Sequence, residues 1–172
     1  MAVDPCERWS RVAAHTIPEV PESTVSSARA GATAADFEAA RDRLLRYDLY
    51  PRRVVASHVC APGGVVVEGC TIAQWVRLGP FRYSCAVRVD ELREGDAEGT
   101  RTLRLAYRTL EGHPERGRIT FTVAWDAAAG RLEARVTHAS RPALWWSRLG
   151  SPFARRLQAR LNAGAARRLA GA

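Results

Sequence analysis

The loop sequence "YRTLEGHPERGR" (residues 107–118) places His113 directly before a proline and between two glycines. An imidazole titrates near neutral pH, so a loop histidine is a candidate for acid–base catalysis or ligand binding. The residue before a proline is restricted to extended backbone, and flanking glycines allow a tight connection. We therefore interpret His113 first as a residue that hydrogen-bonds backbone groups and organises its loop, with proton transfer and ligand recognition as the alternatives.

His138 is the second histidine whose position suggests chemistry. It continues an every-second-residue series of apolar side chains, Leu132, Ala134 and Val136, which places it on the apolar face of a predicted strand. A buried imidazole needs hydrogen-bond partners, and without them it costs roughly 1–3 kcal/mol. His138 is interpreted as a core histidine with satisfied partners, or alternatively as a polar anchor in an apolar ligand pocket.

Five further side chains are candidates for ligand binding because they fall on inward-facing positions or beside the last strand. They are Tyr107, Thr109, Phe121, Trp125 and Arg141. The arginine, within "SRP" (140–142), is interpreted as the partner of a loop carboxylate, with the anionic end of a ligand as the alternative. The sequence has no G-x-S-x-G serine, no phosphate-binding glycine loop and no zinc-finger spacing, so we predict no nucleophilic hydrolysis, cofactor or metal site.

The elements that must position these residues follow from hydrophobic periodicity. Thr33 and Asp36 predict the start of a helix that ends near Tyr47. Period-two alternation, with one apolar and one polar face, predicts an antiparallel sheet wetted on one side. Its strands are predicted at 54–60, 71–78, 83–92, 102–110, 119–125 and 131–139. The segment 151–169 predicts a long helix whose apolar stripe covers the sheet.

This order of elements resembles the helix-grip architecture of the START-like (SRPBCC) superfamily. The strings "FEAARDRLLRYDLYP", "TIAQWVRLGP", "YRTLEGHPERGRITF", "HASRPALWWSRLGSP" and "RRLQARL" are similar to a bacterial and plant family of domains of unknown function in that superfamily, over residues 34–170. The chain departs from the family at Arg108, Glu111 and Arg118. The resemblance implies an α+β helix-grip fold, with a curved antiparallel sheet of about six strands wrapped on a long C-terminal helix, and a cavity for apolar ligands.

Charge and composition restrict the partners. All 26 basic residues are arginines, and the net charge of +8 is concentrated in residues 141–172, which hold seven arginines and no acid. We therefore predict no specific nucleic-acid binding. The segment "LWW" (144–146) and the basic C-terminal helix suit a weak membrane-surface contact, but packing on the sheet is the preferred interpretation. The chain lacks a run of 18 apolar residues and a recognisable signal sequence, so a cytoplasmic location is predicted.

Residues 1–32 are predicted to form a loosely ordered arm, and residues 33–172 a single domain. Cys6, Cys60, Cys70 and Cys85 are expected as small buried hydrophobes in a reducing compartment, with a Cys60–Cys70 disulfide as the alternative. The preferred function is binding of a small apolar or amphipathic molecule between the sheet and the C-terminal helix. The alternatives are a hydrolase-like or cyclase-like enzyme that uses His113 or His138, and docking through the basic helix.

Overall fold

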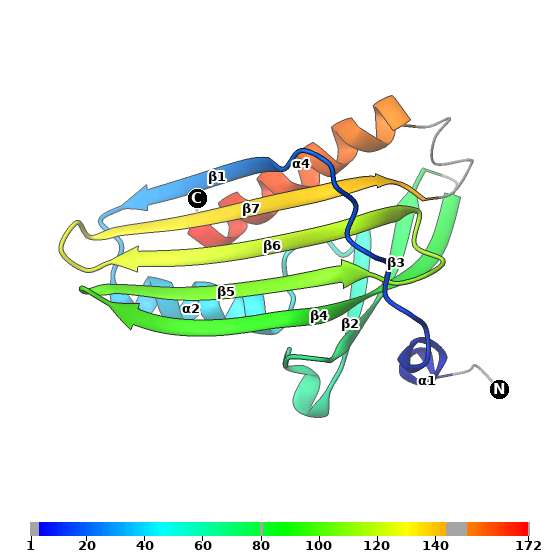
Figure 1. Ribbon diagram of the computed structural model, residues 1–172. Coiled ribbons are helices and arrows are strands. Elements are labelled where there is room, and N and C mark those ends of the chain that lie inside the picture. The colour runs from blue at the N-terminus through cyan, green and yellow to red at the C-terminus, as the bar shows by residue number, and fades with distance from the viewer. Residues whose placement is uncertain (1–3, 80, 144–150, 172) are drawn as a thin grey trace.

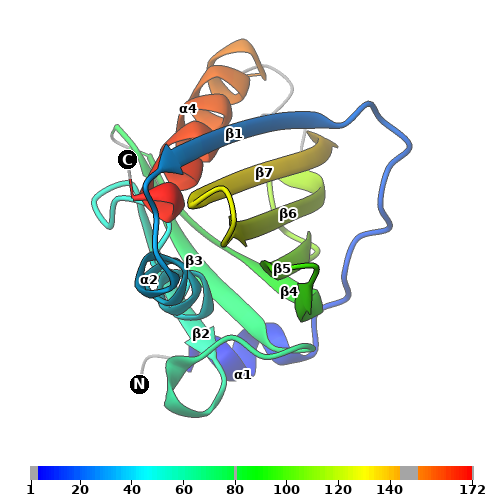
Figure 2. The same cartoon turned by 90° about the vertical axis from the view of Figure 1, so that its left-hand side faces the viewer.

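The computed structural model describes residues 4–79, 81–143 and 151–171. In chain order the elements are α1 (Pro5–Ser10), β1 (Ser23–Ala30), α2 (Ala34–Leu45), β2 (Val55–Cys60), the short 3-10 helix η1 (Pro62–Gly64), β3 (Thr71–Leu78), β4 (Phe81–Ala97), β5 (Thr100–Thr109), β6 (Glu115–Asp126), β7 (Arg131–Pro142) and α4 (Ser151–Ala170). The strands form one antiparallel sheet in the order β1-β7-β6-β5-β4-β3-β2 (Figure 1). The sheet curves around α2 and α4 (Figure 2), which confirms the predicted helix-grip fold.

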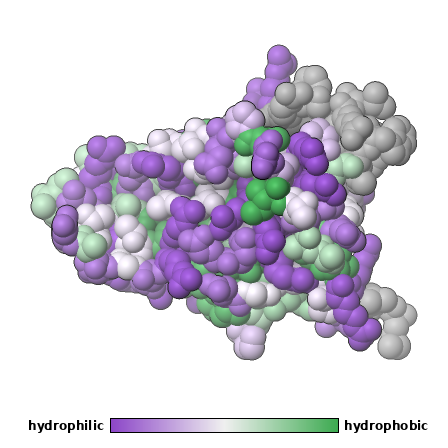
Figure 3. Space-filling model, viewed as in Figure 1, coloured by the Kyte–Doolittle hydropathy of each residue, from purple (hydrophilic) through white to green (hydrophobic). Residues whose placement is uncertain are grey.

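The two faces of the sheet differ as the period-two pattern predicts. On the concave face, Leu105 pairs in register with Phe121, which pairs with Val136, and all three side chains are fully buried. On the convex face, Arg104 binds Glu91 with an N–O distance of 2.8 Å. Hydrophilic residues cover most of the convex face (Figure 3). The apolar core therefore lies between the concave face and the helices.

The helix α2 begins where the capping signal predicts. A carboxylate oxygen of Asp36 accepts hydrogen bonds from the backbone N–H and the hydroxyl of Thr33, both at 2.8 Å. These bonds satisfy groups that the first turn of a helix leaves unpaired. Phe37, Ala40 and Leu44 then follow at helical spacing and are fully buried in the core. This face of α2 fills the concave side beside β6.

The long helix α4 packs against β1, β7 and α2. Leu161, Ala165 and Leu169 turn into the core, as the predicted apolar stripe requires. Its exposed residues include the arginines Arg156, Arg160 and Arg167. The segment "LWW" lies outside the described residues. Within the described part of the chain, no helix has the length and apolar character needed to cross a membrane.

The segment 1–32, predicted as a loosely ordered arm, contains regular structure. The strand β1 pairs with β7 from Ser23 opposite His138 to Ala30 opposite Arg131. Most side chains of β1 are exposed, because it is an edge strand with one neighbour. Backbone pairing, rather than apolar burial, holds it, so hydrophobic periodicity did not predict it. The sheet consequently has seven strands instead of about six.

The expectation that the four cysteines are unpaired buried side chains is wrong for two of them. Cys60 forms a disulfide with Cys6, and not with Cys70. Cys70 and Cys85 are free and buried, as expected of small apolar side chains. The disulfide joins α1 to the end of β2. The pairing was missed because it depends on a contact between segments 54 residues apart in sequence.

Candidate functional site

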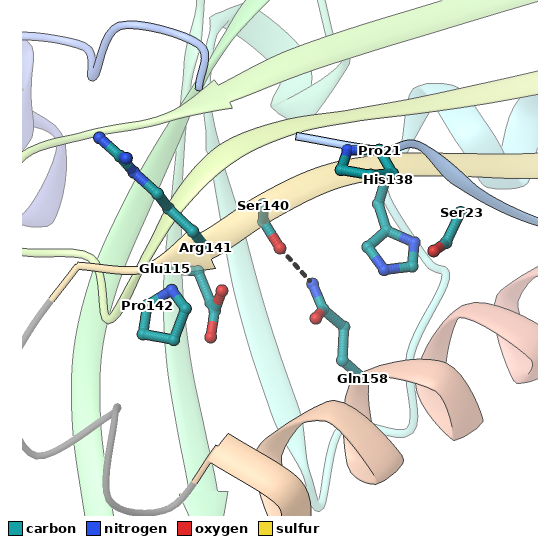
Figure 4. A pocket seen from close by; sticks show the side chains of 8 residues that line it. All are labelled: Pro21, Ser23, Glu115, His138, Ser140, Arg141, Pro142 and Gln158. Atoms are coloured by element: carbon teal, nitrogen blue, oxygen red, sulfur yellow. Dashed lines mark hydrogen bonds between the residues drawn. The ribbon is translucent and has the colours of Figure 1, made fainter. Parts of the chain in front are cut away.

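A part-open pocket of about 280 Å³ lies between the end of β7, the approach to β1, the start of β6 and the first half of α4. The alternation of β7 places His138, Ser140 and Pro142 on the same concave face as the buried Val136. Figure 4 shows these side chains opposite Gln158 of α4. The residues that line the pocket are Pro21, Ser23, Glu115, His138, Ser140, Arg141, Pro142 and Gln158.

His138 is the titratable ring in this pocket. Its Nδ1 lies 3.2 Å from the side-chain nitrogen of Asn162, which is buried in α4. An amide NH₂ group only donates, so in this orientation Nδ1 accepts and the ring proton is on Nε2. Burial lowers the pKa of His138 below its usual 6.5, although a hydrogen bond with the backbone of Ser23 opposes the shift. The pocket therefore presents a half-buried, neutral imidazole at neutral pH.

Three other polar side chains differ in how they face the pocket. The amide nitrogen of Gln158 donates to the hydroxyl of Ser140 at 3.4 Å, which links α4 to β7. In Figure 4, the carboxylate of Glu115 and the amide of Gln158 extend into the space between strand and helix. The guanidinium of Arg141 extends away from that space, so its stem lines the rim. The inner polar groups are thus an imidazole, a hydroxyl, an amide and a carboxylate.

Gly117 brings β6 and β7 unusually close beside the pocket. A Cβ atom at this position would collide with the carbonyl oxygen of Ala139 and lie 2.6 Å from Cβ of Ser140. On its other side, the N–H of Gly117 donates to the hydroxyl of Thr109 at 3.0 Å, and that hydroxyl faces the glycine carbonyl at 3.4 Å. The absence of a side chain at Gly117 therefore fixes where Ser140 stands. Thr109 is a structural neighbour of the pocket and does not line it.

His113 makes hydrogen-bond contacts within its own loop. Its Nδ1 accepts from the backbone N–H of Glu115 at 3.0 Å and lies 2.9 Å from the carbonyl oxygen of that residue. Burial, assisted by the nearby His15, lowers the pKa of His113 to about 4 against the effect of the Glu115 backbone. A group with this pKa is a weak base near pH 7. These contacts are the ones expected of a loop-organising histidine.

Tyr107 and Phe121 lie deep in the core, where they form an aromatic cluster. Their ring centroids are 5.9 Å apart, and each ring also contacts Tyr47. The Tyr47 hydroxyl donates to Tyr107 at 3.0 Å and accepts from the amide nitrogen of Gln74 at 2.8 Å. Burial raises the pKa of both tyrosines well above 10. Each phenol therefore stays protonated and has a partner within the protein.

Trp125 lies near the other end of β6 from Glu115, about 33 Å away at roughly 3.3 Å per strand residue. Its indole nitrogen donates to the carbonyl oxygen of Ala32 at 3.1 Å.

The structure thus brings two of the seven predicted site residues, His138 and Arg141, to the pocket. It places the other five elsewhere: Tyr107, Thr109, His113, Phe121 and Trp125.

Sequence reasoning did not assign Glu115, Ser140, Gln158 and Asn162 to the site. Gln158 and Asn162 are four residues apart, so they share one face of α4. Both stand beside the apolar stripe that packs on the sheet. The sequence signal for a polar pocket wall was therefore the pair Gln158 and Asn162, one helical turn apart and next to the apolar stripe of the helix.

Comparison with known proteins places the chain among structures of one fold. Residues 8–168 match the family described as domain of unknown function DUF1990. No curated protein matches the chain. Among solved structures, TTHA0849 from Thermus thermophilus has a TM-score of 0.59 at 12% identity, covering 88% of this chain and 95% of that one. The hypothetical protein jhp0584 from Helicobacter pylori has a TM-score of 0.53 at 14% identity, covering 71% and 70%.

A third similar structure is the Zhui aromatase/cyclase from Streptomyces sp. R1128. It has a TM-score of 0.48 at 20% identity, and the match covers 87% of this chain and 96% of that chain. The two likenesses with TM-scores above 0.5 show a shared fold, and at identities this low they say nothing about activity. The chemistry of the pocket must therefore be argued from its own residues.

Proposed function

Because this chain belongs to the DUF1990 family and has the helix-grip fold of the START-like superfamily, we propose that it binds a small amphipathic molecule between β7, β1 and α4. One observation carries the proposal. The pocket holds polar groups from both the strand and the helix, His138, Ser140 and Gln158, around open space beside the apolar core. A few placed polar groups beside apolar surface are the usual design of a small-molecule site.

The pocket also limits the chemistry of its occupant. Its volume of about 280 Å³ lies just below the about 300–1,000 Å³ typical of small-molecule sites, so the ligand is small. The hydroxyl of Ser140 and the amide of Gln158 can both donate and accept hydrogen bonds. A neutral molecule with a hydroxyl or carbonyl end and an apolar body fits this lining.

Saturation-transfer NMR with a library of neutral alcohols, phenols and ketones tests the proposal. The variant Gln158→Leu keeps the size and helix propensity of the side chain and removes its polar end. We expect it to weaken binding of the best hits about three- to tenfold, the loss of one hydrogen bond. Arg135→Gln, on the exposed convex face, is the matched control and should leave binding unchanged. Absence of hits, or equal binding by Gln158→Leu, would refute it.

A second function, acid–base catalysis in the same pocket, is favoured by the state of His138. Its lowered pKa keeps the ring neutral at neutral pH, and rotation of the Asn162 amide away from Nδ1 would free that lone pair to take a proton from a substrate. Hydrolysis of p-nitrophenyl acetate provides a simple probe. His138→Ala should lose turnover above background, whereas His113→Ala should keep it. Equal rates in the wild type and His138→Ala would exclude this version of the function.

A further inference from the structure

Cys6, His58 and Cys60 form a cluster on the face of the sheet opposite the pocket. In β2, Val55 and Val59 are buried in the core, so the alternate residues His58 and Cys60 point outward. One ring nitrogen of the histidine and the two sulfur atoms all lie within 4.8 Å of one another. The histidine is exposed and both cysteines are half-buried, so small reductants and ions have access to the cluster.

The helix α1 has anchors besides the disulfide. Trp9 is 6% exposed and packs in a cluster with Ala73 and Ala86 on the convex side of the sheet. A guanidinium nitrogen of Arg88 donates to the carbonyl oxygens of Trp9 and Ser10 at 3.1 and 3.0 Å. Because these contacts involve no sulfur atom, they keep α1 beside β2 when the disulfide is reduced. The two thiols are therefore held close to each other and to the imidazole.

We propose that the reduced form of this cluster binds one zinc ion through both sulfurs and the imidazole. Thiolate and imidazole are the ligands that zinc prefers, and a site with three protein ligands keeps a fourth position for water. Zinc–sulfur bonds of about 2.3 Å at tetrahedral angles place two sulfurs about 3.8 Å apart. In the disulfide the two sulfurs are bonded to each other, so after reduction they must separate to this distance, while the ring nitrogen of His58, already within 4.8 Å of both, moves closer. Two thiolates also neutralise the charge of the ion.

Metal binding and the disulfide exclude one another. A small dithiol supplies two electrons and two protons: the bond between Cys6 and Cys60 breaks, each sulfur becomes a thiol, and the reagent becomes its own disulfide. Zinc then replaces the two thiol protons, which pass to solvent, and a ring nitrogen of His58 donates its lone pair. In the oxidised protein the sulfurs are bonded to each other and have no thiolate to offer. The cluster is thus a zinc site that only reducing conditions open.

Thermodynamic linkage gives the size of the coupling between zinc binding and reduction of the disulfide. At a free zinc concentration 100-fold above the dissociation constant, binding favours the reduced form about 100-fold. For a two-electron couple, this factor corresponds to a shift of about 59 mV in the reduction potential, toward easier reduction of the disulfide. The potential of the Cys6–Cys60 pair should therefore depend on zinc, and a chelator should abolish the dependence.

The test uses the full-length protein without a histidine tag, reduced with a phosphine and handled without oxygen. Titration with Co²⁺ alone reports the site through a thiolate-to-cobalt charge-transfer band, and Zn²⁺ should displace the cobalt. We expect one equivalent of metal to bind the reduced protein and none to bind the oxidised protein. Failure of the reduced, folded protein to take up Co²⁺ at tenfold excess would overturn the proposal.

Variants separate this site from adventitious binding. His58→Ala keeps both cysteines and should weaken zinc binding at least about tenfold, because loss of even an outer-shell partner typically costs 10–100-fold. Cys6→Ser should lose the charge-transfer band. The matched controls are His138→Gln and Cys70→Ala, which remove the same residue types elsewhere and should bind normally. Unchanged affinity in His58→Ala, or a band that persists in Cys6→Ser, would contradict the assignment.

Discussion

The substitution Gly117→Ala tests how the strand pair beside the pocket is built. The new Cβ would collide with the carbonyl oxygen of Ala139 and lie 2.6 and 2.7 Å from Cβ and Cα of Ser140. These neighbours are backbone atoms or lie next to the backbone, so they cannot rotate away. Relief requires β7 to move from β6 where Gly117 pairs with Ser140. The hydrogen bond from Gly117 to Thr109 limits movement on the other side.

Overpacking of a well-packed site costs typically about 1–3 kcal/mol. An alanine would otherwise stabilise a strand by roughly 0.5–1 kcal/mol relative to glycine. The matched control is Gly95→Ala in β4, where the added Cβ would meet the Thr102 hydroxyl at 3.5 Å, an ordinary contact distance. We therefore expect opposite signs: Gly117→Ala lowers the free energy of unfolding, and Gly95→Ala leaves it unchanged or raises it.

Urea denaturation, followed by tryptophan fluorescence and circular dichroism, measures both free energies of unfolding. For a chain of this size, the expected loss in Gly117→Ala lowers the melting temperature by roughly 2–4 °C per kcal/mol. Gly117→Ala should also weaken binding of the hits from the ligand screen, because Ser140 moves with β7. A Gly117→Ala protein as stable as Gly95→Ala would refute the close approach of β6 and β7.

Three other perturbations have defined outcomes. Tyr47→Phe leaves the buried amide nitrogen of Gln74 without its acceptor, so guanidinium titration should show a loss of about 1–3 kcal/mol; stability equal to wild type would contradict that hydrogen bond. Because burial lowers the pKa of His113 to about 4, the imidazole of His113 binds a proton more weakly in the folded protein than in the unfolded chain. Stability should therefore fall as pH drops from about 6.5 to 4, and His113→Gln should flatten the profile, whereas an unchanged slope would argue against a neutral, buried ring. The Cys6–Cys60 disulfide closes a loop of 54 residues, so its reduction should lower the free energy of unfolding by about 4 kcal/mol according to the loop-entropy model. Equal urea midpoints for the oxidised and the reduced protein would contradict this disulfide.

The fold was predictable from sequence wherever burial imposes a period. Phe121 alternates with polar neighbours because one face of β6 is wet, and Thr33 with Asp36 marks the start of α2 through a local capping interaction. The strand β1 escaped prediction because an edge strand needs little apolar surface: Val25 is one of few partly buried residues in it. Its place depends on pairing with β7, which no local pattern encodes.

The site was predictable only in part, for a related reason. The alternation along β7 correctly placed His138 on the concave face, but its partner Asn162 comes from a helix 24 residues later in the chain. Tyr107 has the same alternation signal, yet Tyr47 covers it, so the strand pattern alone could not separate a pocket wall from core. The cluster of Cys6 with Cys60 likewise depends on where α1 docks, which cysteine spacing does not reveal.

The central claim is that a small amphipathic molecule occupies the space between β7 and α4. The most direct measurement is an NMR titration of the labelled protein with the strongest hit from the ligand screen. The side-chain signals of His138 and Gln158 should shift in a saturable way, while the indole N–H of Trp125, near the far end of β6, should stay in place. Shifts centred on Trp125, or none at the pocket residues, would contradict the account.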